Sequence, residues 1–245
     1  YAITDDSNIY LNISEGFRSG GFNVRSGITF EPEELISYEL GAKAAFLDGR
    51  LVADGAIFRS DYKDYQAITQ ISVGAALSQV TGNPGEVEME GLEFTVQYSI
   101  IENLKVGFSG GVVNAEFVKT DPAVTEKLPG DSPTLIPKYS YSAMLDYDFT
   151  WFSSVAGFFH LDYARSGKRE TGLRTGLFAR NPKLETTDIG FLNVQLGAKT
   201  DNVTVRVFSN NLGNELRSTL NNLQAPNHNI QRRPRTFGFD IRYDF

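Results

Sequence analysis

The last nine residues of the chain, Phe237-Gly-Phe-Asp-Ile-Arg-Tyr-Asp-Phe245, alternate strictly between apolar side chains and polar or glycine positions. Successive side chains of a β-strand point to opposite faces, whereas a helix repeats every 3.6 residues. Only an extended strand therefore sorts this stretch into one apolar face and one polar face. We predict a strand that lies between an apolar and a polar environment.

The same alternation recurs upstream. Between residues 139 and 149 the odd positions are apolar and most even positions are serine or aspartate, and the segments 92–98, 192–198 and 8–14 follow the same rule. The run 51–65 is less regular, because Asp54 and Arg59 fall on opposite faces. This pattern predicts ten strands, at residues 8–18, 34–47, 51–66, 85–99, 104–117, 136–148, 151–165, 187–199, 203–212 and 234–245.

The lengths of these strands and of their connections indicate a membrane barrel. The expected strands have 10 to 16 residues, whereas strands of soluble proteins usually have about 5–6 and a tilted transmembrane strand needs about 9–11. Short turns alternate with long connections, and aromatic residues gather near the strand ends, although aromatics also favour strands in general. Outer-membrane barrels have this layout, with the short turns on the periplasmic side. The long connections are expected at 19–33, 67–84, 118–135, 166–186 and 213–233.

Composition excludes several classes of protein. The 245 residues contain no cysteine, which excludes a disulfide framework, a thiolate metal site and a cysteine nucleophile. No stretch approaches 18 consecutive apolar residues, so a transmembrane helix is excluded too. His160 and Asp162 share one strand face near Ser154, which a hydrolase could use, but we interpret them as polar wall residues. No catalytic residue, metal site or cofactor is expected, and no phosphate-binding loop is present.

The beginning of the chain indicates that the barrel is incomplete. Residues 1–3 precede the first expected turn and resemble the end of another strand. An open sheet of ten strands with an apolar face would leave two bare edges, which is unfavourable in water and in lipid. We therefore expect further strands upstream, so that residues 1–245 form a single, incomplete domain.

One longer motif resembles a known family. The run Tyr10-Leu-Asn-Ile-Ser-Glu-Gly-Phe-Arg-Ser-Gly-Gly-Phe-Asn23 is similar to a strand of TonB-dependent outer-membrane receptors. Further segments follow in the family's order, and together they cover essentially the whole chain: 37–44, 46–51, 62–66, 91–93, 114–117, 210–212 and 234–245. The resemblance implies an all-β, antiparallel transmembrane barrel of the 22-stranded type, of which about the last ten strands are present and the plug domain is absent.

The same resemblance implies a function and a set of partners. We expect a receptor in the outer membrane of a Gram-negative bacterium that imports a scarce ligand, first of all a ferric siderophore or other iron complex, with TonB-coupled energy. TonB would act through the missing plug, and lipopolysaccharide and the barrel assembly machinery would be further partners, with no role for nucleic acid. Tyr243 and Phe245 match the assembly signal, although Asp240 replaces its usual glycine. An oligosaccharide or cobalamin receptor and a passive porin remain alternatives, ahead of an outer-membrane enzyme or a secreted adhesin.

Charge distribution suggests where a ligand could bind. The chain carries −7 overall, yet residues 165–185 carry +4 and residues 213–235 carry +3. A cationic entrance concentrates anionic ligands, and arginine suits carboxylates and phosphates. The alternative is that these arginines hold lipopolysaccharide phosphates or are simply solvated. The candidate ligand-binding residues are Arg18, Arg165, Arg169, Arg174, Arg232 and Arg233.

Face assignment also predicts which residues look into the interior of the barrel. These are the polar members of the alternating strands, and they would line the path of the imported ligand. The predicted lumen residues are Asn12, Glu39, Lys43, Glu93, Gln97, Asp146, Asn193, Gln195, Arg206 and Asp240.

Overall fold

The computed structural model describes residues 1–73, 76–124, 127–152, 155–170, 185–216, 218–221, 229–231 and 233–245. They form an antiparallel sheet of eleven strands in the order β1-β2-β5-β6-β7-β8-β9-β10-β11-β12-β15, so each strand pairs with its nearest long neighbour in the chain. The strands are β1 (Ala2–Thr4), β2 (Ser7–Arg18), β5 (Glu33–Phe46), β6 (Leu51–Val73), β7 (Ala76–Ile101), β8 (Leu104–Thr120), β9 (Tyr139–Phe152), β10 (Val155–Ser166), β11 (Ile189–Lys199), β12 (Val203–Asn210) and β15 (Thr236–Tyr243).

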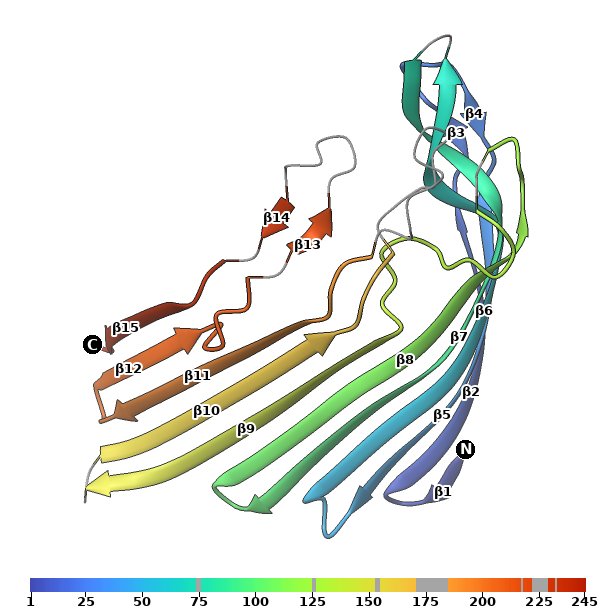
Figure 1. Ribbon diagram of the computed structural model, residues 1–245. Coiled ribbons are helices and arrows are strands. Elements are labelled where there is room, and N and C mark those ends of the chain that lie inside the picture. Colours follow the sequence, from blue (N-terminus) through green and yellow to red (C-terminus); the bar gives the residue numbers. More distant parts are fainter. Residues whose placement is uncertain are drawn as a thin grey trace.

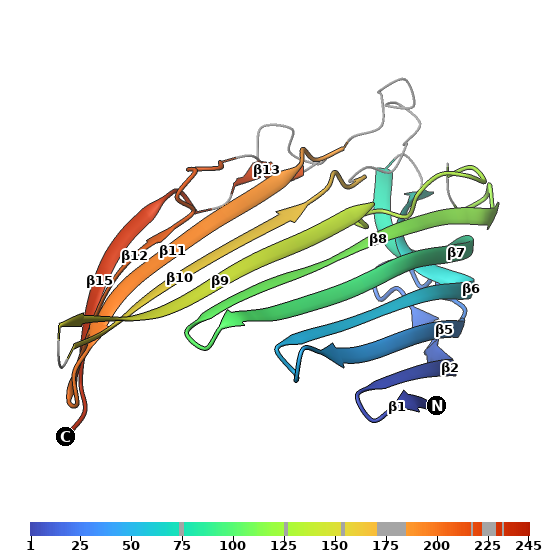
Figure 2. The same cartoon turned by 90° about the horizontal axis from the view of Figure 1, so that it is seen from below.

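The sheet is a curved, open wall. Its two edges are β1 and β15, which lie far apart in both views (Figures 1 and 2). Two small hairpins stand in the long connections, β3 (Gly21–Phe22) with β4 (Thr29–Phe30) and β13 (Ser218–Asn221) with β14 (Asn229–Gln231). The all-β antiparallel fold is therefore confirmed, and each of the ten predicted strands is present. No helix that could cross a membrane occurs in the part of the chain that the structure describes.

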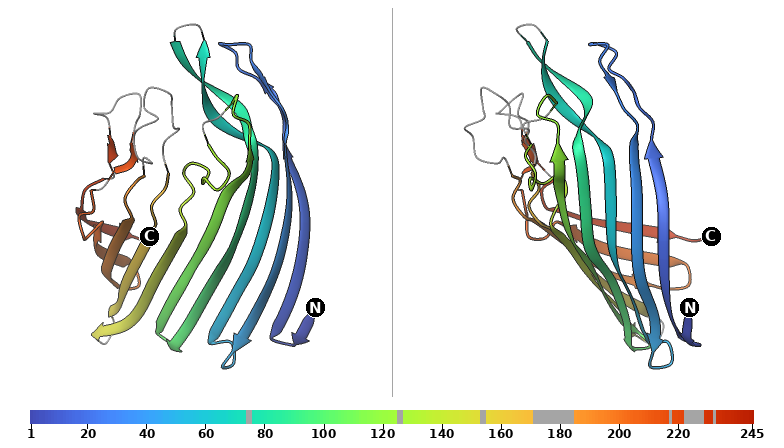
Figure 3. Two further views of the ribbon diagram at one scale, coloured as in Figure 1. Left: turned by 45° about the vertical axis from the view of Figure 1, so that its right-hand side comes forward. Right: turned by 90° about the vertical axis from the view of Figure 1, so that its right-hand side faces the viewer.

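One predicted loop is wrong. Residues 67–84 were expected to form a long connection, but β6 and β7 continue through most of them and pair as far as Val73↔Ala76. The hairpin rises well beyond the ends of the neighbouring strands (Figure 3). Register shifts interrupt the pairing between Tyr62 and Ala67, where Asp64 adopts a positive φ of 49°. Such a bulge breaks the alternation on which the prediction rested without ending the strand.

The wall has one polar face and one apolar face. Both faces are continuous from strand to strand, because the register aligns residues that point the same way. We call the face that carries Asn12, Glu39 and their aligned neighbours the inner face, and the face that carries Leu11, Leu40 and their neighbours the outer face. Leu40 pairs with Leu11 on one side and Ile57 on the other, and 49% of its surface is exposed. On β15 the outer residue Phe239 is 73% exposed. The apolar side chains of the outer face are therefore not covered by protein.

The irregular run 51–65 is explained by the same register. Asp54 lies on the inner face, opposite Lys43 and Thr95. Arg59 lies on the outer face above the apolar rows, where it pairs with Asp61 at 3.1 Å and Glu88 at 2.9 Å. Asp54 and Arg59 thus lie on opposite faces of β6, and Arg59 is nearer the end of the wall that carries the long loops.

The described residues have a small apolar core at the end of the wall that carries the long loops. Val87 and Phe117 are buried there, and Tyr65 packs edge-on against Phe117 with ring centroids 6.0 Å apart. Residues 130–131 lie beside β8 at this end of the wall, because the Phe117 amide donates to the Asp131 carbonyl at 2.9 Å and the Gly130 amide donates to the Phe117 carbonyl at 2.8 Å. The segment that follows β8 is therefore held against the upper end of that strand.

Candidate ligand-binding cavity

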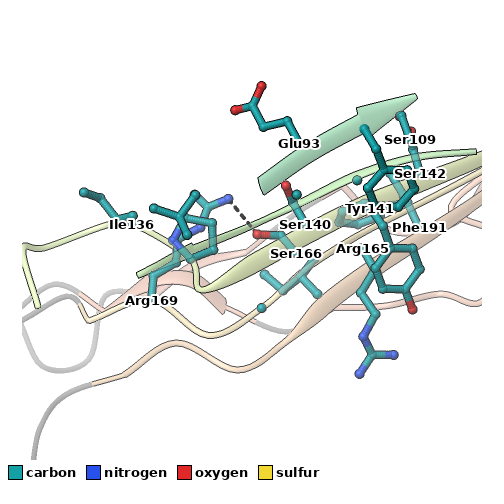
Figure 4. Close-up of a pocket in the computed structure, with 18 of the residues that line it drawn as sticks. Glu93, Ser109, Ile136, Ser140, Tyr141, Ser142, Arg165, Ser166, Arg169 and Phe191 are labelled. Atoms are coloured by element: carbon teal, nitrogen blue, oxygen red, sulfur yellow. Dashed lines mark hydrogen bonds between the residues drawn. The ribbon is translucent and has the colours of Figure 1, made fainter. Parts of the chain in front are cut away.

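A cavity of about 700 Å³ lies on the inner face between β6 and β11. Its wall comes from six neighbouring strands and from the two segments that follow β8 and β10, so residues far apart in the sequence meet there. Arg169 and Ile136 lie at one end of it, and Ser109, Ser142 and Phe191 lie at the other (Figure 4). The polar residues that line it are Asp54, Glu93, Thr95, Ser109, Ser140, Tyr141, Ser142, Arg165, Ser166, Arg169, Thr186 and Thr187.

Small hydroxyl side chains leave the space open. Ser109 and Ser142 are register partners on β8 and β9, and their hydroxyl oxygens are 2.8 Å apart. Ser140 pairs in register with Ser166 on one side and Gly111 on the other. Larger side chains at these inner positions would fill the hollow, so the run of serine and glycine across three strands creates it.

Arg165 and Arg169 are the basic residues that line the cavity, and backbone contacts fix the position of Arg169. The Thr186 amide donates to the Arg169 carbonyl at 2.9 Å, and the Arg169 amide donates to Thr186 Oγ1 at 3.0 Å. Its guanidinium donates to Ser166 Oγ at 3.1 Å. Within the described residues, no carboxylate lies within ion-pair distance of Arg169.

The structure separates Arg165 from Arg169, although both were predicted to bind ligand. Arg165 lies on the outer face with Tyr141 and Tyr163, and its side chain points away from the cavity that its strand borders (Figure 4). It donates to Asp188 at 3.2 Å, and the Tyr139 hydroxyl donates to the same carboxylate at 2.7 Å. The Tyr139 hydroxyl and the Arg165 guanidinium hold the pKa of Asp188 below its ordinary value.

Of the other predicted arginines, Arg18 and Arg233 do not line the cavity. Arg18 lies on the inner face, where it donates to Glu33 at 2.8 Å and to the Gln66 carbonyl at 2.8 Å. Arg233 is exposed, and its carbonyl accepts a hydrogen bond from the Asn211 side chain at 3.1 Å. Arg174 and Arg232 lie outside the described residues, as does most of the basic stretch 165–185.

The predicted lumen residues stand on the inner face, and several of them are joined across strands. Arg206 donates to Asp240 at 2.8 Å and to Gln195 at 3.0 Å, and Asn193 donates to Asp162 at 2.7 Å. His160 has Nδ1 2.5 Å from Asp146 and Nε2 3.4 Å from Asp162. Two carboxylates thus hold the imidazole, and Ser154 of the hydrolase alternative lies outside the described residues. The remaining members, in register order, are Asn12 opposite Glu39, Lys43 opposite Asp54, Glu93 opposite Gly111, and Gln97 opposite Gly107.

Glu93 and Arg169 were predicted from the sequence as site residues, but the hydroxyl residues of the cavity were not. Thr95, Ser109, Ser140 and Ser142 stood on polar strand faces, so the alternation marked their direction, whereas Ser166, Thr186 and Thr187 lie at or beyond the ends of β10 and β11. Which serines and threonines align with one another depends on strand register, and that could not be read from any single strand. The cavity is therefore a product of register rather than of a motif.

The chain is similar in sequence to one protein family and to several receptors. The sequence model of a family described as "TonB dependent receptor-like, beta-barrel" matches residues 1–212. The pesticin receptor of Yersinia enterocolitica is 27% identical over 144 residues, which cover 57% of this chain and 20% of that protein. The metal-pseudopaline receptor CntO of Pseudomonas aeruginosa is 27% identical over 220 residues, which cover 86% of this chain and 28% of that protein.

Solved structures show the same architecture. The ferric yersiniabactin uptake receptor FyuA from Yersinia pestis superposes with a TM-score of 0.79 at 20% identity, over 100% of this chain and 36% of that one. At this identity the likeness concerns the fold. The chain spans only about a fifth to a third of the length of the proteins that it matches.

Proposed function

The chain belongs to the TonB-dependent receptor-like β-barrel family, and from this premise we propose that it forms part of an outer-membrane receptor that imports a metal complex. Members of this family reside in the outer membrane of Gram-negative bacteria. Within the proposal, residues 1–245 are the C-terminal portion of a larger barrel of the 22-stranded type. The upstream strands and a plug domain would come from the rest of the protein, and the imported ligand would be a ferric siderophore or a similar chelate.

The observation that carries the proposal is the two-faced wall. Outer-face residues such as Leu40 and Phe239 are about half to three-quarters exposed, yet the inner face behind them is polar and hydrogen-bonded. A single layer with this distribution is stable only if lipid covers the outer face while the inner face borders water or protein. The cavity on the inner face then lies where a ligand would enter.

The mechanism that we propose follows from this arrangement. A ligand would bind at the long-loop end of the wall, near the cavity, and TonB-coupled movement of the plug would open a path along the inner face. Glu93, Asp146 and Arg206 would belong to that path. Tyr243 and Phe245 pack edge-on with ring centroids 5.0 Å apart at the free edge, where the assembly machinery would meet them. Lipopolysaccharide would surround the outer face above the apolar rows.

The test is uptake by a deletion strain. A Gram-negative host that lacks its own siderophore receptors is expected to accumulate a labelled metal chelate only when the full-length receptor and TonB are both present. A panel of iron, copper, nickel and zinc chelates should be offered, together with cobalamin and labelled oligosaccharides. Entry without TonB would support the porin alternative, and uptake confined to cobalamin or an oligosaccharide would replace the metal complex as cargo.

A pair of adjacent substitutions tests the orientation of the wall. Leu40→Arg places a charge on the outer face and is expected to destabilise the barrel by about 2–4 kcal/mol if Leu40 lies near the bilayer midplane. Glu39→Arg, one residue earlier, places the same charge on the inner face and should cost far less. Urea unfolding of both variants in phospholipid vesicles measures the difference, and equal losses would contradict the assignment of faces.

A further inference from the structure

The charges of the cavity are arranged as two separate poles. We infer that it recognises a bipolar metal chelate, with a free carboxylate for Arg169 at one end and a protonated amine for Glu93 and Asp54 at the other. This inference rests on the proposed import of a metal complex and specifies the class of that complex. Three features carry it: an uncompensated guanidinium, two uncompensated carboxylates, and a neutral stretch of hydroxyls between them.

The anionic end of the ligand is inferred from the contrast between Arg169 and the other arginines. Arg18, Arg59 and Arg206 each pair with a carboxylate at 2.8–3.1 Å, so their charges are already balanced. Arg169 has a hydroxyl partner, Ser166, and no carboxylate partner in the described part of the chain. A half-buried guanidinium held in place by backbone contacts retains donors for a carboxylate, with which it forms strong, paired hydrogen bonds.

The cationic end is inferred from Glu93 and Asp54. Glu93 lies between Ala56 and Gly111 in register, so neither neighbour offers a cation. Asp54 lies between Lys43 and Thr95, but no ion pair joins it to Lys43, whose ammonium sits over the Tyr10 ring, 5.9 Å from its centroid. Among the described residues, neither carboxylate has an ion-pair partner. Two such carboxylates on one wall attract a cationic group from a ligand.

The spacing of the poles sets the size of the ligand. Ser166, which holds Arg169, and Glu93 lie on the same register row, separated by Ser140 and Gly111. Three inter-strand steps place them roughly 14 Å apart, since neighbouring strands are about 4.8 Å apart. The intervening hydroxyls carry no charge and can bond to amide or hydroxamate oxygens. A cavity of about 700 Å³ suits a ligand of this length.

The experiment uses the full-length receptor and four probes built on one linear ferric trihydroxamate. The parent carries a primary amine at one terminus and a carboxylate at the other, and three derivatives have the amine acetylated, the carboxylate methylated, or both. The parent is expected to bind at least about a hundredfold more tightly than the doubly blocked probe, because it keeps both charged hydrogen bonds and each changes Kd by about tenfold. Quenching of the receptor's intrinsic fluorescence by the ferric probe measures Kd.

Substitutions then assign each pole. Arg169→Gln should raise Kd about tenfold or more for probes with a free carboxylate and leave the methyl ester unchanged. Glu93→Gln should do the same for probes with a free amine and leave the acetylated probe unchanged. Arg59→Gln and Glu90→Gln are the matched controls, because they remove the same groups from the outer face of β6 and β7. Arg169→Lys keeps the charge and should recover part of the affinity, which separates charge recognition from misfolding.

The outcomes distinguish this inference from the function on which it rests. If the receptor imports a metal chelate with TonB but binds the four probes equally or not at all, the bipolar inference is overturned and the uptake function stands. The inference is also overturned if either substitution weakens all four probes alike. If no metal chelate is imported, the proposed function itself fails.

Discussion

Replacing Lys127 with alanine is expected to destabilise the folded segment between β8 and β9 by about 3–5 kcal/mol. The side chains of Lys127 and Glu170 are only 6% and 12% exposed, and their charged atoms are 2.7 Å apart. Lys127 also donates to the Ser132 carbonyl at 2.7 Å. Without the ammonium, the buried Glu170 carboxylate would lose this ion pair, which costs far more than the loss of an exposed ion pair.

Hydrogen exchange of the Leu135 amide measures this effect, since that amide donates to the Glu170 carbonyl at 2.7 Å. Exchange should accelerate strongly in Lys127→Ala. Lys168→Ala is the control, because Lys168 and Glu185 form a longer, exposed pair at 3.8 Å. The double variant Lys127→Met/Glu170→Leu should be less destabilised than the single variant, because it removes both charges. Unchanged exchange in Lys127→Ala would show that the pair does not hold the segment in place.

The second large effect is expected at Gly85, where β7 bends into the raised hairpin. Gly85 has φ +149°, a conformation that residues with a side chain rarely adopt. A Cβ atom there would also clash with the carbonyl oxygen of Lys119 on the neighbouring strand, and backbone cannot move aside as a flexible side chain can. Gly85→Ala should therefore destabilise the barrel by about 3 kcal/mol or more.

A matched substitution isolates the cause. Gly16→Ala lies in β2, where the nearest atom to an added Cβ is Leu35 Cδ2 at 3.9 Å, so ordinary packing is expected. The fraction of each variant that runs as folded barrel on a heated, detergent-containing gel reports assembly, and the urea midpoint reports stability. Equal behaviour of the two alanine variants would contradict the structural account of Gly85.

The faces of a strand can be predicted from the residues of that strand alone, whereas a bulge within it cannot. The alternation in Phe237–Phe245 predicts a strand with an apolar face, and the structure contains β15 with Phe239 and Ile241 exposed on one side. Alternation failed only where a bulge interrupts it. Asp64 shifts the register in β6, and the paired residues beyond it were predicted to be a loop.

In the candidate site, alternation along a strand predicts the direction of one arginine but not of the other. Arg165 and Arg169 are four residues apart and were predicted to act together. The Arg165 guanidinium pairs with Asp188 on the outer face, whereas the Arg169 guanidinium bonds to Ser166 in the cavity. Strand β10 ends at Ser166, so alternation still governs Arg165 but no longer governs Arg169. The direction of Arg169 depends instead on its hydrogen bonds to Thr186, a residue seventeen positions away.

The amino-acid sequence by itself determined the strands, their two faces and the family, because the direction of each side chain along a strand follows from covalent geometry with a period of two. Only the tertiary structure decided which inner residues meet. Register joins Asp54, Thr95, Ser109 and Ser142 across four strands, and the folded loops bring Arg169 to the same hollow. Those contacts depend on the pairing of segments that are distant in the chain. The energy of such pairing is a property of both segments together, so the sequence of one segment does not give it.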